Sequence, residues 1–139
     1  MKPFKFENLR VWQLALEYVD LMYRLAEGLP MNEQYNLASQ LTRAATSITL
    51  NIAEGSTGQT DSEQRRFLGM ALRSLIETVA CQRLIARRNY ISDVGVLETA
   101  NQKAHELARA LQAFRNALSA SQVSEEHAIY LTDQIETNF

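Results

Sequence analysis

The sequence predicts an all-α protein, an up-down-up-down antiparallel four-helix bundle, and two observations carry this prediction. Only two prolines and five glycines occur in 139 residues, so long stretches contain no helix breaker. Along four such stretches the apolar residues recur at steps of three and four, which is the spacing of one helix face. Because short connections join the four stretches, neighbouring helices should run antiparallel.

The first expected helix begins near Leu9, with Asn8 as its N-cap, and ends at about Ala26, where Gly28 stops it. Residues 1–7 are expected to form an extended lead-in to it. Its apolar band consists of Trp12, Ala15, Leu16, Val19, Met22, Tyr23 and Ala26. We interpret Trp12 in this band as a core or interface anchor rather than a ligand-stacking aromatic.

The second expected helix has Pro30 in its first turn, where a missing N–H costs nothing, and runs to about Glu54, with Gly55 as its stop. One face is apolar, with Leu37, Leu41, Ala45, Ile48 and Ile52. Another face carries a row of mostly short polar residues: Asn36, Gln40, Arg43, Ser47, Asn51 and Glu54. Amides and hydroxyls can be buried with their hydrogen bonds made, so we expect another helix or chain to cover this row. A surface that is simply rich in Ser, Thr and Asn is the alternative.

The third helix is expected from a cap at Thr60 or Asp61 to about Arg88, and the fourth from a cap at Ser92 or Asp93 to about Ser119. The bundle then spans residues 1–121. Residues 122–139 are expected to form a C-terminal helical extension that docks on the bundle or on a neighbouring subunit, with a frayed tail as the alternative.

Counting outward from the turn near Thr57 places the second helix level with the third at Arg43 and Glu77. We predict a covered ion pair between these two residues, because a row shielded from water would need its charges paired. The full structural polar cluster predicted here contains Gln40, Arg43, Ser47, Asn51, Glu54, Ser74 and Glu77.

A protein that mainly binds the nucleic-acid backbone usually carries a strong positive net charge, whereas this chain has a net charge of −2. The charged residues are, however, unevenly distributed along the sequence. Residues 62–90 are basic and residues 92–139 are acidic, a contrast typical of contacts between helices or subunits. The candidate nucleic-acid-binding residues are Arg65, Arg66, Arg73, Arg83, Arg87 and Arg88.

No catalytic, cofactor-binding or metal-ligating residue stands out. Neither His105 nor His127 follows a glutamate at the Glu-x-x-His spacing of di-metal bundles. The lone Cys81 lies among apolar residues and is expected to be a small buried hydrophobe. We therefore expect a non-enzymatic protein without a cofactor. The sequence shows no signal-peptide pattern and no run long enough to span a bilayer, so we expect a cytoplasmic location.

Several motifs resemble one known family: Phe6-x-x-Leu9-x-Val11-Trp12, Leu29-Pro30-x-x-Glu33, Ser74-x-x-Glu77, and the run from Gln40 to Gly55 that ends in Asn-Ile-Ala-Glu-Gly. This is the four-helix-bundle family encoded in intervening sequences of bacterial 23S rRNA genes, some members of which are called ribosomal-protein-like. The resemblance covers residues 4 to about 119. This chain departs from the pattern at Arg73, where a glycine is common.

The resemblance implies an up-down bundle without enzymatic activity that assembles into homo-oligomeric rings, with five subunits as the associated form. A related branch is the accessory protein of diversity-generating retroelements, whose basic ring is thought to bind nucleic acid. Two hypotheses follow. The first is a self-associating interaction scaffold of unknown biochemical task. The second is a binding protein for nucleic acid or the ribosome that uses the basic third helix.

Overall fold

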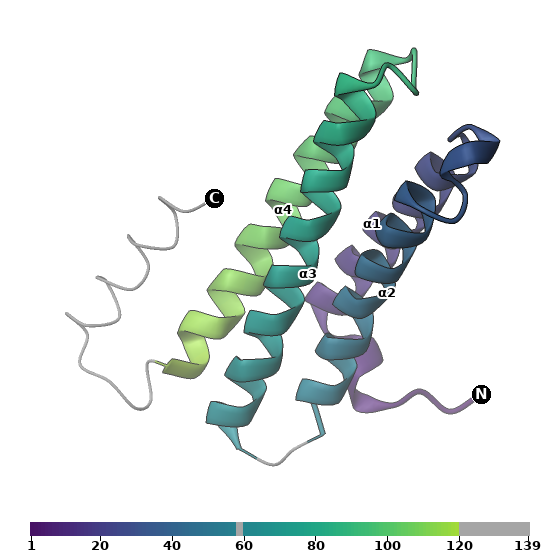
Figure 1. Ribbon diagram of the computed structural model, residues 1–139. Coiled ribbons are helices and arrows are strands. Elements are labelled where there is room, and N and C mark those ends of the chain that lie inside the picture. The colour runs from purple at the N-terminus through teal and green to yellow at the C-terminus, as the bar shows by residue number, and fades with distance from the viewer. Residues whose placement is uncertain (58–59, 120–139) are drawn as a thin grey trace.

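The computed structural model describes residues 1–57 and 60–119, and in this part of the chain it is an all-α four-helix bundle, as predicted (Figure 1). The four helices are α1 (Arg10–Glu27), α2 (Leu37–Gly55), α3 (Asp61–Arg87) and α4 (Val94–Ser119). Each helix packs against the next in the chain, and α4 returns to pack against α1. The predicted extension over residues 122–139 lies outside the described residues.

The connections explain where the helices begin and end. Thr60 is the N-cap of α3, where its hydroxyl accepts a hydrogen bond from the backbone N–H of Glu63, as its residue type predicts. Asp93 precedes α4 and accepts from the backbone N–H of Gly95. After α3, Asn89 adopts a left-handed conformation with φ of 56°, which ends the helix.

Two predicted helix starts are wrong. Asn8 does not cap α1, because it belongs to a short 3₁₀ helix, η1 (Lys5–Asn8), and α1 begins at Arg10. Likewise Pro30 precedes a second 3₁₀ turn, η2 (Met31–Glu33), and α2 begins only at Leu37. In both places the chain makes a tight turn before the helix, which the apolar spacing of the helices does not reveal.

The core follows the predicted stripes, and alanine is frequent in it. Leu41, Ile48, Ile52, Leu68, Leu75 and Leu111 are fully buried, together with Ala15, Ala45, Ala71 and Ala100. The predicted band of α1 was too wide, because Leu16 and Tyr23 are exposed. Trp12 is half-buried, with its ring edge-on to Phe6 at 4.6 Å between centroids, so the lead-in folds onto α1.

A chain of buried hydrogen bonds crosses the core from α1 to α3. The Gln82 side-chain amide donates to the Tyr18 hydroxyl (2.6 Å), and Tyr18 in turn contacts the Thr78 hydroxyl at 2.7 Å. Thr78 donates to the backbone carbonyl of Leu75, so the proton between Tyr18 and Thr78 must come from Tyr18. Burial raises the pKa of Tyr18 to about 12, which keeps the phenol protonated as this arrangement requires.

The two middle helices are in close contact near the turn that joins them. A Cβ atom on Gly55 would lie 2.9 Å from Cβ of Phe67, closer than real Cβ atoms come to one another. Gly55, the last residue of α2, therefore allows the first turns of α3 to pack directly against it.

Candidate interaction surfaces

The polar row of α2 forms hydrogen bonds at its centre and faces solvent at its ends. Ser74 on α3 donates to the Ser47 hydroxyl at 2.9 Å, and the Asn51 amide reaches the Ser47 carbonyl and hydroxyl at 2.8 and 3.1 Å. These three side chains are half-buried. Four members of the predicted cluster are exposed instead: Gln40, Arg43, Glu54 and Glu77.

The predicted ion pair between Arg43 and Glu77 is wrong for the protomer. Both side chains are exposed, and the ion pairs that join described residues are Arg66–Glu63 and Lys103–Glu17. The contact between Ser47 and Ser74 places Arg43 about level with Thr78 along the bundle axis. The predicted position, level with Glu77, was therefore off by one residue of α3. It is Thr78 that points into the core, whereas Arg43 and Glu77 project outward. Among the helices of residues 1–57 and 60–119, none covers the whole row, because Gln40, Arg43 and Glu54 are exposed.

A shallow groove of about 590 Å³ runs along the outer side of α2. Short side chains form most of its floor: Ser39, Thr42, Thr46, Ser47 and Asn51. Three large, exposed side chains from three different helices stand along it, and their exposed fractions are 44% for Tyr23, 55% for Leu50 and 36% for Met70. The groove therefore combines apolar side chains with a floor that another helix could approach closely. The polar row predicted from the sequence supplies Ser47 and Asn51 to this floor and Arg43 and Glu54 to the rest of the lining. The other floor residues and the apolar side chains beside them were not predicted.

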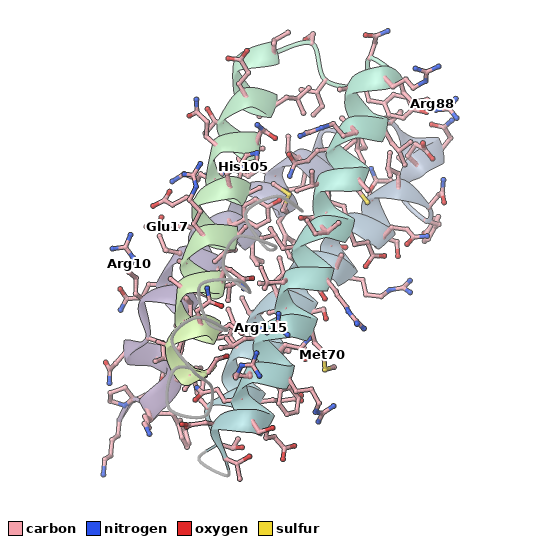
Figure 2. The ribbon with its side chains drawn as sticks, turned by 90° about the vertical axis from the view of Figure 1, so that its left-hand side faces the viewer. Arg10, Glu17, Met70, Arg88, His105 and Arg115 are labelled. Atoms are coloured by element: carbon pink, nitrogen blue, oxygen red, sulfur yellow. The ribbon has the colours of Figure 1, made fainter. Side chains whose placement is uncertain are left out.

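The candidate nucleic-acid-binding arginines of α3 do not form one uniform surface. Arg66 pairs with Glu63 at 3.3 Å and lies 4.8 Å over the ring of Phe67, and Arg83 donates to the side chain of Asn101 on α4. Arg87 and Arg88 are exposed at the end of α3, where Figure 2 shows Arg88. Arg65 is half-buried, and Arg73 is exposed.

One further arginine, Arg115 of α4, lies in the seam between α3 and α4 (Figure 2). Burial lowers its pKa, and the nearby positive charges of Arg65 and Arg73 lower it further. Sequence reasoning missed Arg115, because its position beside α3 depends on how two helices pack. Only the spacing of Arg65, Gly69 and Arg73, four residues apart, could be read from the sequence.

Cys81 and His105, for which no catalytic or metal-binding role was predicted, lie in environments that suggest none. Cys81 is buried, and burial together with the charge of Glu77 raises the pKa of its thiol. His105 lies on the face shared with Asn101 and Arg83. Within residues 1–57 and 60–119, no three His, Cys, Asp or Glu side chains are grouped so as to hold a metal ion. No helix in that same part of the chain is long and apolar enough to cross a membrane.

Comparison with known proteins decides the family. A model of the family described as 23S rRNA-intervening sequence protein matches residues 7–113, most of the chain. The chain belongs to this family. A solved structure from Bacteroides thetaiotaomicron, a protein of unknown function from the S23 ribosomal protein family, is 28% identical. It has a TM-score of 0.68, and the match covers 76% of this chain and 97% of that one. No protein with curated annotation matches the chain.

These findings confirm the family that the motifs resembled and the helical fold that the resemblance implied. The related solved protein, from the S23 ribosomal protein family, is described as a protein of unknown function, so this similarity does not name a biochemical task. The five-subunit ring and the link to retroelement accessory proteins stay predictions.

Proposed function

We propose that this intervening-sequence family member is a non-catalytic, self-associating helical bundle that serves as an interaction scaffold. The observation that carries the proposal is the groove along α2, where Tyr23, Leu50 and Met70 expose apolar surface beside a floor of Ser and Thr side chains. The polar row was expected to be covered by another helix or chain, and in the described part of the protomer its Gln40, Arg43 and Glu54 are exposed. The row is open in the protomer, so a second chain is what would cover it.

The chemistry of the groove suits a second copy of this chain. Apolar groups removed from water at its edges would supply about 25 cal/mol per Å², while short hydroxyl side chains let a partner backbone approach. At its ends, exposed Arg43 and Glu54 carry opposite charges that can fix the orientation of a partner. A ring with five subunits is the form that the resemblance suggests.

Mass measurement by light scattering tests the proposal. We expect the full-length protein to have a mass that is a multiple of 15.8 kDa, and Leu50→Glu to shift it toward the monomer because a charge would enter an apolar contact. Leu16→Glu is the matched control, since it makes the same change at an exposed leucine of α1 that does not line the groove. A monomeric wild type, or equal dissociation by both variants, would contradict the proposal.

A second candidate function is nucleic-acid binding by α3, as the basic composition of residues 62–90 suggested. The specific observation in its favour is that Arg73, Arg87 and Arg88 are exposed and make no ion pair within the described residues. A titration with RNA and duplex DNA separates the two functions. Binding whose logarithmic affinity falls steeply with the logarithm of salt concentration supports this candidate, and no binding at low salt rejects it.

The proposal includes no catalytic step and a cytoplasmic location. The first is supported by the buried Cys81, whose raised pKa favours an inert thiol. The second is supported by the presence of a single cysteine, which cannot form a disulfide within the chain.

A further inference from the structure

Three arginines meet in the seam between α3 and α4. Arg65, Gly69 and Arg73 follow one another at steps of four residues, so they lie along one side of α3 about 6 Å apart. A Cβ atom on Gly69 would lie 3.4–3.6 Å from Nη2, Cζ and Nε of Arg115. The Arg115 guanidinium therefore lies over Gly69, near Arg65 and Arg73. Figure 2 shows Arg115 between α3 and α4.

Within residues 1–57 and 60–119, the cluster of Arg65, Arg73 and Arg115 has no ion-pair partner to balance its charge. The Nε atoms of Arg65 and Arg115 are buried and make no hydrogen bond. A buried donor without a partner is costly, and three like charges close together are also unfavourable. Both costs would be removed by an anion with several acceptor oxygens.

We propose that the cluster of Arg65, Arg73 and Arg115 binds a phosphate dianion, either free phosphate or the terminal phosphoryl group of a small ester. Guanidinium groups present N–H donors in a planar fork that matches the oxygens of a phosphate. Three positive charges suit a dianion better than the single charge of a nucleic-acid phosphodiester. The half-buried seam would also strengthen the attraction relative to open solvent.

The site is independent of the proposed self-association. Met70, which lines the groove, lies on the other edge of α3 from Arg115 in Figure 2. A variant that changes the cluster therefore need not change the assembly, and the mass of each variant can be measured beside its anion affinity.

Titration of the full-length protein with inorganic phosphate tests the site. The buffer should contain no other oxoanion, and the pH should be about 8 so that phosphate is a dianion. Sodium chloride keeps the ionic strength constant. We expect saturable binding of one phosphate per chain, with shifts of the Gly69 amide and the Arg115 Nε–H in nuclear magnetic resonance spectra. Chloride alone should not cause these shifts.

Substitutions identify the residues involved. Arg115→Gln should weaken phosphate binding by at least about tenfold, because a charge-assisted, forked contact is lost. Arg115→Lys should recover only part of the affinity, since it restores the charge without the fork. Arg109→Gln is the control, with the same change of charge at an exposed position on the same helix.

Gly69→Leu tests the geometry without changing any charge. The larger side chain would occupy the space of the Arg115 guanidinium, so phosphate binding should weaken although all three arginines remain. Circular dichroism should show that each variant keeps the helical content of the wild type. This second variant keeps the proposal testable if Arg115→Gln fails to fold.

Two arms distinguish the source of the phosphate. Equal affinity for inorganic phosphate and glycerol phosphate assigns the site to the phosphoryl group alone, whereas tighter binding of the ester assigns it to an esterified ligand. A linear response that does not saturate, or equal weakening by Arg109→Gln and Arg115→Gln, would overturn the proposal.

Discussion

At the scale of single residues, Tyr18 is a buried polar group held by two side-chain hydrogen bonds. It accepts a hydrogen bond from Gln82 and donates one to Thr78, both on α3, although Tyr18 itself belongs to α1. All three side chains are buried. Because buried polar groups need their partners, each of these residues depends on the other two.

Tyr18→Phe should lower the free energy of unfolding by about 1–3 kcal/mol, because it leaves the buried Gln82 amide and Thr78 hydroxyl with a partner removed. Denaturant unfolding followed by circular dichroism measures the change. Tyr35→Phe is the control, since Tyr35 is 98% exposed and the same substitution there should have little effect. Equal stability of the Tyr18→Phe variant and wild type would show that the buried network contributes nothing.

The same residue predicts an alkaline loss of stability. The pKa of Tyr18 is raised to about 12 by burial, against about 10 in an unfolded chain. The unfolded state therefore releases this proton first. The stabilisation is complete below pH 10 and disappears as the pH rises through about 12, for a loss of about 3 kcal/mol.

Unfolding free energies at about pH 9 and pH 11, compared between wild type and Tyr18→Phe, isolate this effect from the other titrating groups. We expect wild type to lose more stability than the variant over this interval. Parallel losses in the two proteins would mean that Tyr18 is not the group responsible.

At the scale of helices, two glycines of the α2–α3 hairpin should respond to alanine in opposite ways. A Cβ on Gly55 would meet Phe67 Cβ at 2.9 Å, whereas a Cβ on Gly69 would meet Arg115 at an ordinary 3.4 Å. Gly55→Ala should destabilise by about 1–3 kcal/mol through overpacking. Gly69→Ala should stabilise by about 0.5–1 kcal/mol, because alanine favours a helix. Thermal unfolding of the Gly55→Ala and Gly69→Ala variants, each compared with wild type, measures the two changes in stability. Changes of the same sign would contradict the packing described for these glycines.

Helix boundaries could be predicted from sequence where a side chain itself caps the helix, and not where the backbone turns first. Thr60 or Asp61 was predicted as the cap of α3, with Glu63 in its first turn, and the structure shows that Thr60 is the cap. The start of α2 was predicted seven residues too early, at Pro30 rather than Leu37, because η2 intervenes. A 3₁₀ turn of three residues is too short to show a repeating spacing of apolar residues, so the sequence does not reveal it.

The candidate sites required more than one helix and were harder to predict. Counting turns gave nearly the right height for Arg43 against α3, but not which side chains turn inward. That depends on α1 as well, because Tyr18 of α1 is the partner that Thr78 meets. Arg115 was missed for the same reason, since only the packing of α4 on α3 brings it to Gly69.

At the scale of the whole molecule, self-association predicts that stability depends on protein concentration. If folded chains associate through the α2 groove and unfolded chains do not, the melting temperature should rise as the protein is concentrated. Leu50→Glu should melt at the same temperature at every concentration, and Leu16→Glu should behave as wild type. Calorimetry over about a hundredfold range of concentration provides the measurement. A wild-type melting temperature that does not move would count against assembly.

The alanines of the core have a consequence for where this protein can meet other molecules. Ala15, Ala45, Ala71 and Ala100 are completely enclosed, and helices whose facing side chains are so small lie near the short end of the usual 8–10 Å between axes. A ligand the size of a nucleotide could enter the core only if these helices moved apart. This family member is therefore expected to bind partners through its surface residues. Its relatives could acquire new partners through substitutions at the surface while the helical core stays the same.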